Sequence, residues 1–475
     1  MTDTPIISDE LAAQFAAIVG VKYALDDSGD MAPYLTEWRD LYSGSARMIL
    51  RPGSTEQVSQ ILKLANETGT GIVPQGGNTG LVGAQTPFDG KCEIVVSLSR
   101  MNEITTIDTD ANTLVCGAGT VLANIQAAAD DANRLFPLSL GAEGSCQIGG
   151  NLSTNAGGTG VLAYGNARDM VLGLEVVLAN GNIWDGLKTL RKDNTGYDLK
   201  QMFVGAEGTL GIITKVALKL FAKPKAREVA FAGLASPEAA VAMFRHVIGA
   251  EGRNITGFEI MPRIGLEFVL RHTPGTRDPL ANDHPWYVLL EISSGDHPEA
   301  LKSRAENLLG EIIEAGIVAD AVLANSGQQA KDFWHMRTSL SEVQKQEGGS
   351  IKHDISVPVS SIPEFLTRAA IEVEKCVPGA RPVPFGHLGD GNIHYNISQP
   401  IGADRDAFIT RWEDVNDAVH AVVVALDGSI SAEHGIGILK RDLLPRYKSD
   451  VEMEMMRALK QTYDPNNILN PGKLI

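Results

Sequence analysis

The chain has 475 residues, a formal net charge of −17, 44% hydrophobic residues and 21% charged residues. This length exceeds a single ordinary core, so two or three domains are expected in a soluble globular protein. The acidic balance argues against nucleic acid and against anionic membrane surfaces as partners. No segment approaches the roughly 18 apolar residues of a membrane span.

The cysteines and the start of the chain bear on location. Four cysteines are scattered without a Cys-x-x-Cys pair, at Cys92, Cys116, Cys146 and Cys376. Free thiols in a reducing compartment are the simplest interpretation. The segment from Met1 to Glu10 lacks the basic region and apolar run of a signal peptide. We therefore expect a cytoplasmic protein.

The first half of the chain mixes helices and strands irregularly. Ser8 is expected to cap a helix that Gly20 ends, and Ser54 a second helix that Gly69 ends. A third helix is expected over 121–132, capped by Thr120. Strands are expected at 71–74, 93–97, 113–116, 173–178 and 212–220. This order lacks the regular alternation of a doubly wound sheet.

The second half alternates strands with amphipathic helices. Strands are expected at 228–231, 286–292, 318–323 and 350–357, and helices from Ser236, over 298–315, 328–346, 362–376, 406–425 and 450–462. This pattern indicates an α+β domain, an antiparallel sheet covered on one face. Residues 221–225 are the best candidate domain boundary.

A histidine hairpin is the first candidate site. His387 and His394 flank the turn signal Gly389-Asp390-Gly391. The sequence after the turn alternates, so Asn392, His394 and Asn396 should share one strand face, opposite Ile393, Tyr395 and Ile397. Two histidines resemble metal ligands that need a carboxylate, and Glu433 is the obvious third, with His434 left to move protons. A polar hairpin with surface histidines is the open alternative.

Three glycine-rich stretches form the second candidate site: 76–80, 141–160 and 205–211. Unhindered backbone N–H groups in such loops can cradle a pyrophosphate. The first loop fits neither the P-loop nor the Rossmann pattern. Three such loops in one domain suggest a long ligand laid along the backbone.

These motifs occur together in one order: 74–83, 137–151, 205–213, the His387 hairpin and the Glu433 segment. The chain thereby resembles the flavin-linked D-2-hydroxyacid dehydrogenases of the vanillyl-alcohol-oxidase type fold. That resemblance implies an FAD-binding domain at 1–222 with two subdomains, a substrate (cap) domain at 223–428, and a C-terminal segment at 429–475 that packs back on the FAD domain.

The resemblance also implies noncovalent FAD. Relatives with covalent flavin place a His or Cys in these loops, whereas the first loop here has Asn78 and Thr79, and Cys146 is the one thiol in the second. The residues implied to contact FAD are Pro74, Gly76, Gly77, Asn78, Thr79, Gly80, Leu81, Ser139, Gly141, Gly144, Ser145, Ile148, Gly149, Gly150, Asn151, Thr154, Gly157, Glu207, Gly208, Ile213 and Asn470.

For catalysis, the resemblance implies a divalent metal, Zn²⁺ or Mn²⁺, on His387, His394 and Glu433, with His434 as the general base. It implies that the substrate is a D-2-hydroxy acid held by Arg337, Ser341, Lys352, Asn396 and His434. Two cations in an acidic protein favour the diacid D-2-hydroxyglutarate over D-lactate, and glycolate and D-malate are further alternatives. Arg337 and Ser341 should be neighbours on one helix face.

Partners and competing classes follow from the same comparison. Electrons would pass to an external acceptor, such as an electron-transfer flavoprotein, a quinone or a keto acid, and a homodimer is possible. A flavin-free metallohydrolase that uses His387, His394 and Glu433 is one alternative. A noncatalytic flavin-binding protein is another, and Glu433-His434 speaks against it.

Overall fold

A computed structural model describes residues 7–90 and 93–475, so the first six residues and Cys92 lie outside the described part. The chain divides into two compact units. Unit 1 comprises Met1–Gly158, Gly165–Lys223 and Glu433–Ile475, and unit 2 comprises Thr159–Tyr164 and Pro224–Ala432. Both units combine sheets with helices, which confirms the α+β class.

Unit 1 contains two main sheets and a short ribbon. The first has the order β1-β2-β4-β3 and pairs β4 in parallel with both neighbours. Its strands are Ala24–Leu25, Ala46–Leu50, Glu93–Ser97 and Ile72–Gln75. The second is antiparallel, in the order β5-β6-β10-β8-β9. Its strands are Ile104–Asp108, Thr113–Gly117, Ile212–Lys219, Val171–Val177 and Ile183–Gly186. The ribbon pairs β7 (Arg134–Leu135) with β11 (Phe221–Ala222).

Two of the three helices expected in unit 1 have the predicted caps. The Ser8 and Ser54 hydroxyls accept the Leu11 and Gln57 amides, and Gly69 ends α3 in the left-handed region. The expectation for Thr120 is wrong, because its hydroxyl donates to Gly117 O and Val121 precedes α4 without a side-chain cap. The helices are α1 (Asp9–Val19), α2 (Ser28–Leu35), α3 (Thr55–Thr68), α4 (Leu122–Asp131), α5 (Ile148–Ser153), α7 (Ala167–Met170), α15 (Leu444–Tyr447) and α16 (Asp450–Tyr463).

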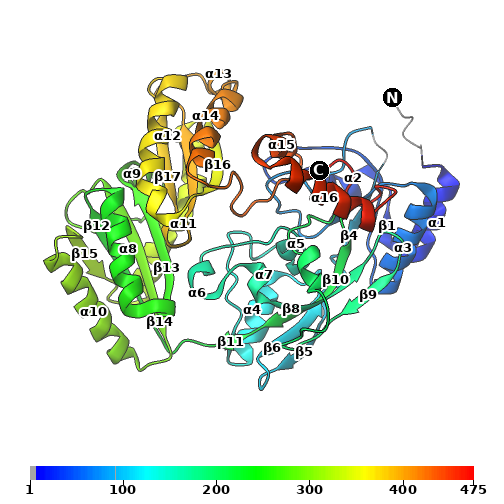
Figure 1. Ribbon diagram of the computed structural model, residues 1–475, viewed down its shortest axis with the longest axis horizontal. Helices are drawn as coiled ribbons and strands as arrows, with labels where there is room; N and C mark the ends of the chain where they lie inside the picture. The colour runs from blue at the N-terminus through cyan, green and yellow to red at the C-terminus, as the bar shows by residue number, and fades with distance from the viewer. Residues whose placement is uncertain (1–6, 91–92) are drawn as a thin grey trace. The chain divides into compact units, whose positions relative to one another are not determined.

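Unit 2 is built on one seven-stranded antiparallel sheet, in the order β15-β12-β14-β13-β17-β18-β16 (Figure 1). The strands are Asp320–Leu323, Ala226–Leu234, Trp286–Ser294, Ile255–Pro262, Arg381–His387, Asn392–Ser398 and Ser350–Ser356. Its helices are α6 (Val161–Tyr164), α8 (Pro237–Glu251), α9 (Arg263–His272), α10 (Pro298–Glu314), α11 (Gly327–Val343), α12 (Ile362–Cys376), α13 (Arg405–Ile409) and α14 (Trp412–Ala425).

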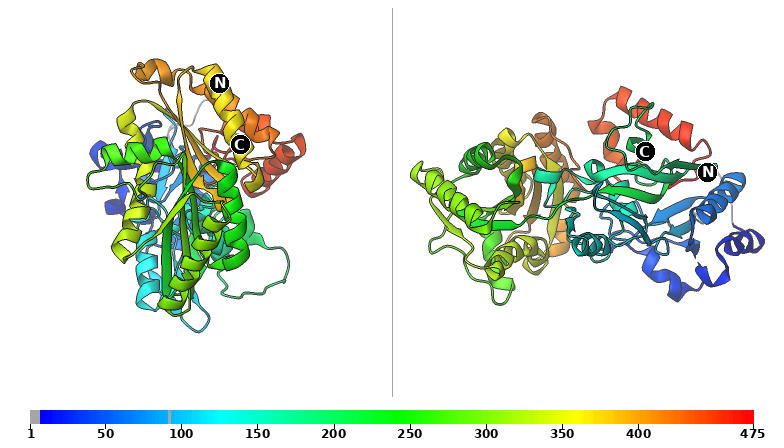
Figure 2. Two further views of the ribbon diagram at one scale, coloured as in Figure 1. Left: turned by 90° about the vertical axis from the view of Figure 1, so that its left-hand side faces the viewer. Right: turned by 90° about the horizontal axis from the view of Figure 1, so that it is seen from below.

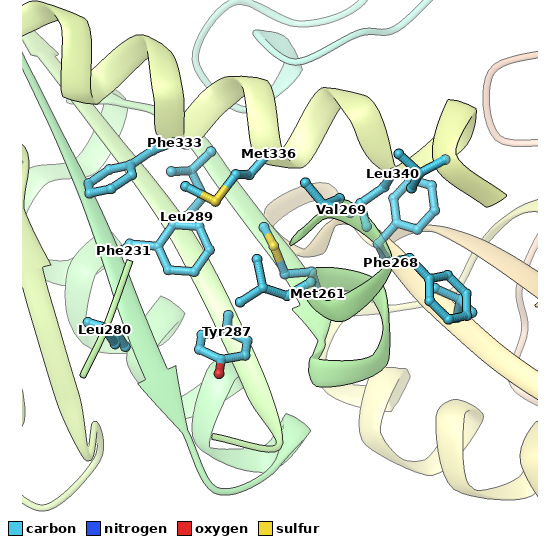
Figure 3. Close-up of a cluster of buried hydrophobic side chains, with 14 of the residues drawn as sticks. Phe231, Met261, Phe268, Val269, Leu280, Tyr287, Leu289, Phe333, Met336 and Leu340 are labelled. Atoms are coloured by element: carbon cyan, nitrogen blue, oxygen red, sulfur yellow. The ribbon is translucent and has the colours of Figure 1, made fainter. Parts of the chain in front are cut away.

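Helices cover both faces of this sheet, so the expectation of one covered face is wrong. They pack in pairs, α8 with α10, α12 with α14, and α9 with α11. The left view of Figure 2 shows the strands between helices on either side. In Figure 3, Phe333, Met336 and Leu340 of α11 point from the helix toward the sheet. They pack in one buried cluster with sheet residues that include Phe231, Met261, Tyr287, Leu289 and Phe385. Strands buried on both faces explain the near-continuous apolar sequences of β12 and β14.

Candidate active site

The three glycine-rich loops of unit 1 lie against one another. A side chain on Gly77 would place its Cβ 2.0 Å from Ser145 O, so the first and second loops touch at the backbone. A Cβ on Gly208 would lie 2.6 Å from the ring of Pro74, so the third loop lies against the end of β3, which leads into the first loop. These close approaches require glycine. The loops predicted to share one long ligand therefore converge in the structure.

The surroundings of these loops fit a bound cofactor. Asn78 Oδ1, Gln147 Oε1 and Asn151 Oδ1 are buried without a hydrogen-bond partner among the described residues. Buried polar atoms of this kind call for an explanation, and a polar ligand is one. A Cβ at Gly141, Gly144 or Gly150 would meet no atom within 4 Å. The loops thus offer both unpaired acceptors and open space at the backbone.

Two predicted cofactor residues have partners within the protein. Asn78 adopts φ +54°, and its side-chain amide donates to Pro33 O and Thr36 O at 3.0 and 2.8 Å. Glu207 is 5% exposed, and its two carboxylate oxygens accept the amides of Ile436 and Gly437, each at 2.7 Å. Burial raises the pKa of Glu207 to about 7, although these two donors act to lower it. The Asn470 side chain in turn donates to Glu207 O.

The Cys146 thiol in the second loop is a poor nucleophile. It is buried, and this burial raises its pKa above the ordinary value, despite a hydrogen bond with Asn151 that acts in the opposite direction. Because the thiolate is the reactive form, a raised pKa lowers its population at neutral pH.

The Glu433 segment begins the last part of unit 1. The Glu433 carboxylate accepts the amide of Gly158, at the end of the second loop, at 2.5 Å. A Cβ on Gly157 would lie 2.3 Å from the same carboxylate oxygen. A glycine at 157 is therefore needed for Glu433 to lie against the loop.

In unit 2, the α11 side of the sheet changes from apolar to polar toward β18 and β16. Register pairs Asp354 with His394 and Lys352 with Asn396. Asn392 and Asn396 bond to Asp354 and Gln344, whereas Tyr395 packs on Phe365 of α12. The structure thus confirms the expected alternation of polar and apolar side chains along β18.

The two hairpin histidines lie together in unit 2. The rings of His387 and His394 are 5.6 Å apart between centroids and nearly perpendicular. Asp354 Oδ1 lies 3.7 Å from His394 Nδ1. The turn thus folds the chain back on itself, which brings the two histidines of the motif together.

Glu259 on β13 ties His387 to Arg337. Its carboxylate is 1% exposed and accepts from Arg337 Nε at 2.7 Å and from His387 Nδ1 at 2.6 Å. Burial acts to raise the pKa of Glu259, but His387 and Arg337 outweigh it and lower that pKa to about 2. An ionised Glu259 accepts the Nδ1 proton, so Nε2 is the nitrogen with the lone pair for a metal.

The remaining predicted substrate residues gather at the C-terminal half of α11. Arg337 is buried, and Ser341 lies one turn later, exposed. Lys352 Nζ donates to Ser341 O at 3.1 Å. Asn396 is 3% exposed and donates to Gln344, which leaves it deep beneath the surface. The structure therefore brings all four residues to one end of one helix.

Sequence reasoning missed Glu259 altogether, because the strand that carries it was not predicted. One signal was available. Glu259 lies near the centre of a mostly apolar run, Ile255–Pro262, and a carboxylate in such a run is rarely buried unless it is paired. Its partners, Arg337 and His387, are 78 and 128 residues away in sequence.

Comparison with known proteins places the chain in a family. The model of the FAD-linked oxidase C-terminal domain matches residues 223–474, and an FAD-binding domain matches 46–186. The chain belongs to the FAD-linked oxidase family. This membership confirms FAD as the expected cofactor and the resemblance to flavin-linked D-2-hydroxyacid dehydrogenases.

Individual relatives agree along nearly the whole chain. A mitochondrial D-2-hydroxyglutarate dehydrogenase of Arabidopsis thaliana is 37% identical over 97% of this chain and 80% of its own length. That of Danio rerio is 39% identical over 92% and 80%. A D-2-hydroxyglutarate–pyruvate transhydrogenase of Saccharomyces cerevisiae is 37% identical over 99% and 95%. The structure of p-cresol methylhydroxylase shares the fold, with a TM-score of 0.76 at 18% identity over 98% of this chain and 96% of that one.

The relatives contradict the cytoplasmic expectation, since the plant and fish proteins are both named as mitochondrial. The expectation rested on scattered thiols and on the lack of a signal-peptide pattern, and neither distinguishes one reducing compartment from another. Cys116, Cys146 and Cys376 are indeed free. Within the described residues, no helix is both long and apolar enough to cross a membrane.

Proposed function

We propose that this flavoenzyme oxidises D-2-hydroxyglutarate to 2-oxoglutarate and passes the electrons to an external acceptor. The observation that carries the proposal is the similarity, at 37–39% identity over at least 92% of the chain, to proteins named for D-2-hydroxyglutarate. Two cations at one end of α11, Arg337 and Lys352, suit an acid with two carboxylates.

Separate residues of the chain bind the substrate carboxylates and accept the hydroxyl proton. Arg337 has two amino groups beyond the Nε that donates to Glu259, and these can bind a carboxylate. Lys352 supplies a second cation from β16. His434 takes the proton of the substrate hydroxyl, because an imidazole can accept and release protons near neutral pH. FAD, held noncovalently by the glycine-rich loops, supplies the acceptor for the hydride that leaves Cα.

We also propose a divalent metal, Zn²⁺ or Mn²⁺, on His387, His394 and Glu433. Two imidazoles and one carboxylate are the ligand set of a catalytic site with open positions. Glu259 supports this assignment, because a metal-bound histidine usually donates its second nitrogen to a carboxylate or carbonyl. Such an ion, when bound, lowers the pKa of a coordinated hydroxyl.

The substrate is tested by a screen with an artificial dye as the electron acceptor. D-2-hydroxyglutarate, D-lactate, D-malate and glycolate are compared by kcat/KM. We expect D-2-hydroxyglutarate to be highest, and a higher value for D-lactate would overturn the choice of acid. A preparation without flavin absorbance near about 450 nm would instead favour a metallohydrolase.

A variant sharpens this test. Lys352→Met should lower kcat/KM for D-2-hydroxyglutarate more than for D-lactate, because D-lactate lacks the distal carboxylate. Lys331→Met, at an exposed position of helix α11 away from β16, is the control. An equal loss with both acids would exclude Lys352 as the partner of the distal carboxylate.

A further inference from the structure

Residues of the first motif, 74–83, and of the second and third glycine-rich loops contact the segment that carries His434. We define the base segment as Glu433–Leu439. The second loop contacts it through the Gly158 amide, which donates to Glu433 at 2.5 Å. The first motif, 74–83, contacts it through Val82 O, which accepts the amides of Ile438 and Leu439 at 2.8 and 3.2 Å.

The third loop contacts the base segment through the buried side chain of Glu207. Its two oxygens bind consecutive amides, those of Ile436 and Gly437, two and three residues after His434. The fit is close, because a Cβ on Gly435 would lie 2.6 Å from Glu207 Oε1, and Gly435 has φ +83°. Glu207 is itself fixed, since its own amide donates to Ser153 O and its carbonyl accepts from Asn470.

We propose that Glu207 is a positioning residue, which holds the base segment on the FAD loops so that His434 meets the substrate hydroxyl. The inference rests on the proposed role of His434 as the base. It differs from the role that the family resemblance implies for Glu207, a contact to FAD. Both carboxylate oxygens bind backbone amides of the base segment, so the side chain is already engaged away from a ligand.

The physical reason is that misplacement of a catalytic group is costly. A shift of about 1 Å can slow a reaction roughly 10²-fold. Hydrogen bonds from a carboxylate to backbone amides are among the stronger ones in proteins. One side chain that binds two adjacent amides fixes both the position and the direction of the backbone beside His434.

The experiment compares Glu207→Gln with a matched control, Glu175→Gln. The side-chain amide introduced by Glu207→Gln keeps one acceptor and turns a donor toward the other backbone N–H. Glu175 is also buried in unit 1 and accepts from Thr55 and Thr214, which lie outside the base segment. We expect Glu207→Gln to retain FAD and its reduction by dithionite, while flavin reduction at saturating substrate slows roughly 10²-fold. Glu175→Gln should change this rate less than about twofold, because it leaves every contact of the base segment in place.

Two results would overturn the inference. One is flavin reduction in Glu207→Gln at the wild-type rate. The other is loss of FAD with a normal rate in the fraction that retains it, because Glu207 would then act on the cofactor alone.

Hydrogen exchange separates this inference from the proposed function. The amides of Ile436 and Gly437 should exchange at least about tenfold faster in Glu207→Gln, since one of the two amides loses its acceptor. Their exchange should be unchanged in Glu175→Gln. Unchanged exchange of these two amides in Glu207→Gln would refute the role of Glu207 as a positioning residue, whichever acid is the substrate. If none of the four acids reduces the wild-type flavin, the proposed function fails, and the exchange result still decides the role of Glu207 as the anchor.

Discussion

Replacement of Glu259 by alanine should destabilise unit 2 more than any surface change. The Glu259 carboxylate is 1% exposed and bonds to Arg337, whose side chain is 7% exposed, and to His387, at 9%. Loss of one partner of a buried ion pair costs about 3–5 kcal/mol, because the other charge stays buried and uncompensated. At a slope of about 2 kcal/mol per molar urea, the midpoint should fall by roughly 1.5 M or more.

The assay is urea unfolding followed by tryptophan fluorescence. Three of the five tryptophans, Trp286, Trp334 and Trp412, lie in unit 2, and flavin release reports unit 1 separately. Glu364→Ala, which breaks an exposed ion pair with Arg368 on α12, is the control and should cost less than about 1 kcal/mol. A loss below about 1 kcal/mol for Glu259→Ala would refute the uncompensated-charge argument.

Three further predictions concern the active site. His434→Ala should abolish flavin reduction by substrate while FAD stays bound, and normal bleaching would remove His434 from the role of base. Prolonged EDTA treatment should stop turnover without release of FAD, and added Zn²⁺ or Mn²⁺ should restore it; full activity of a metal-free preparation would contradict the metal. Glu207→Gln should also change the pH dependence of stability. The pKa of Glu207 in the folded protein is about 7 against an ordinary 4.5, so the native wild type binds this proton more tightly than the unfolded chain does. As the pH rises from 4.5 to 7, the unfolding free energy of the wild type should therefore fall relative to that of the variant by up to about 3 kcal/mol. A constant difference across that range, measured by urea unfolding, would be the contrary result.

Elements with local signals were predictable from the sequence. The helix over 362–376 is found at the same residues, and the helix after Ser236 begins at Pro237, with the serine hydroxyl bound to the Ala239 amide. A cap and a helical period are properties of neighbouring residues, so they can be read without the rest of the fold. The polar face of β18 was predictable for the same reason, since alternation is local.

Features that depend on distant partners were not predictable. The strand β13 was missed because Gly257 and Glu259 interrupt its apolar pattern. Both exceptions have long-range causes: a Cβ on Gly257 would lie 2.9 Å from the ring of Trp334, and Glu259 is paired with Arg337 and His387. The partners of the Glu207 side chain are 229 and 230 residues away, so its contact with the base segment could not be read from the loop.

The two units hold different parts of the proposed machinery. His387, His394, Arg337 and Lys352 belong to unit 2, whereas the base segment follows directly after Ala432 and belongs to the unit with the FAD loops. The position of His434 relative to the flavin is therefore set within unit 1, by Glu207, Gly158 and Val82. Changes at Arg337 or Lys352 should then alter which acid is oxidised, through kcat/KM. Changes at the anchors of the base segment should instead slow flavin reduction at saturating acid, because they move the base and leave the cations that bind the carboxylates in place.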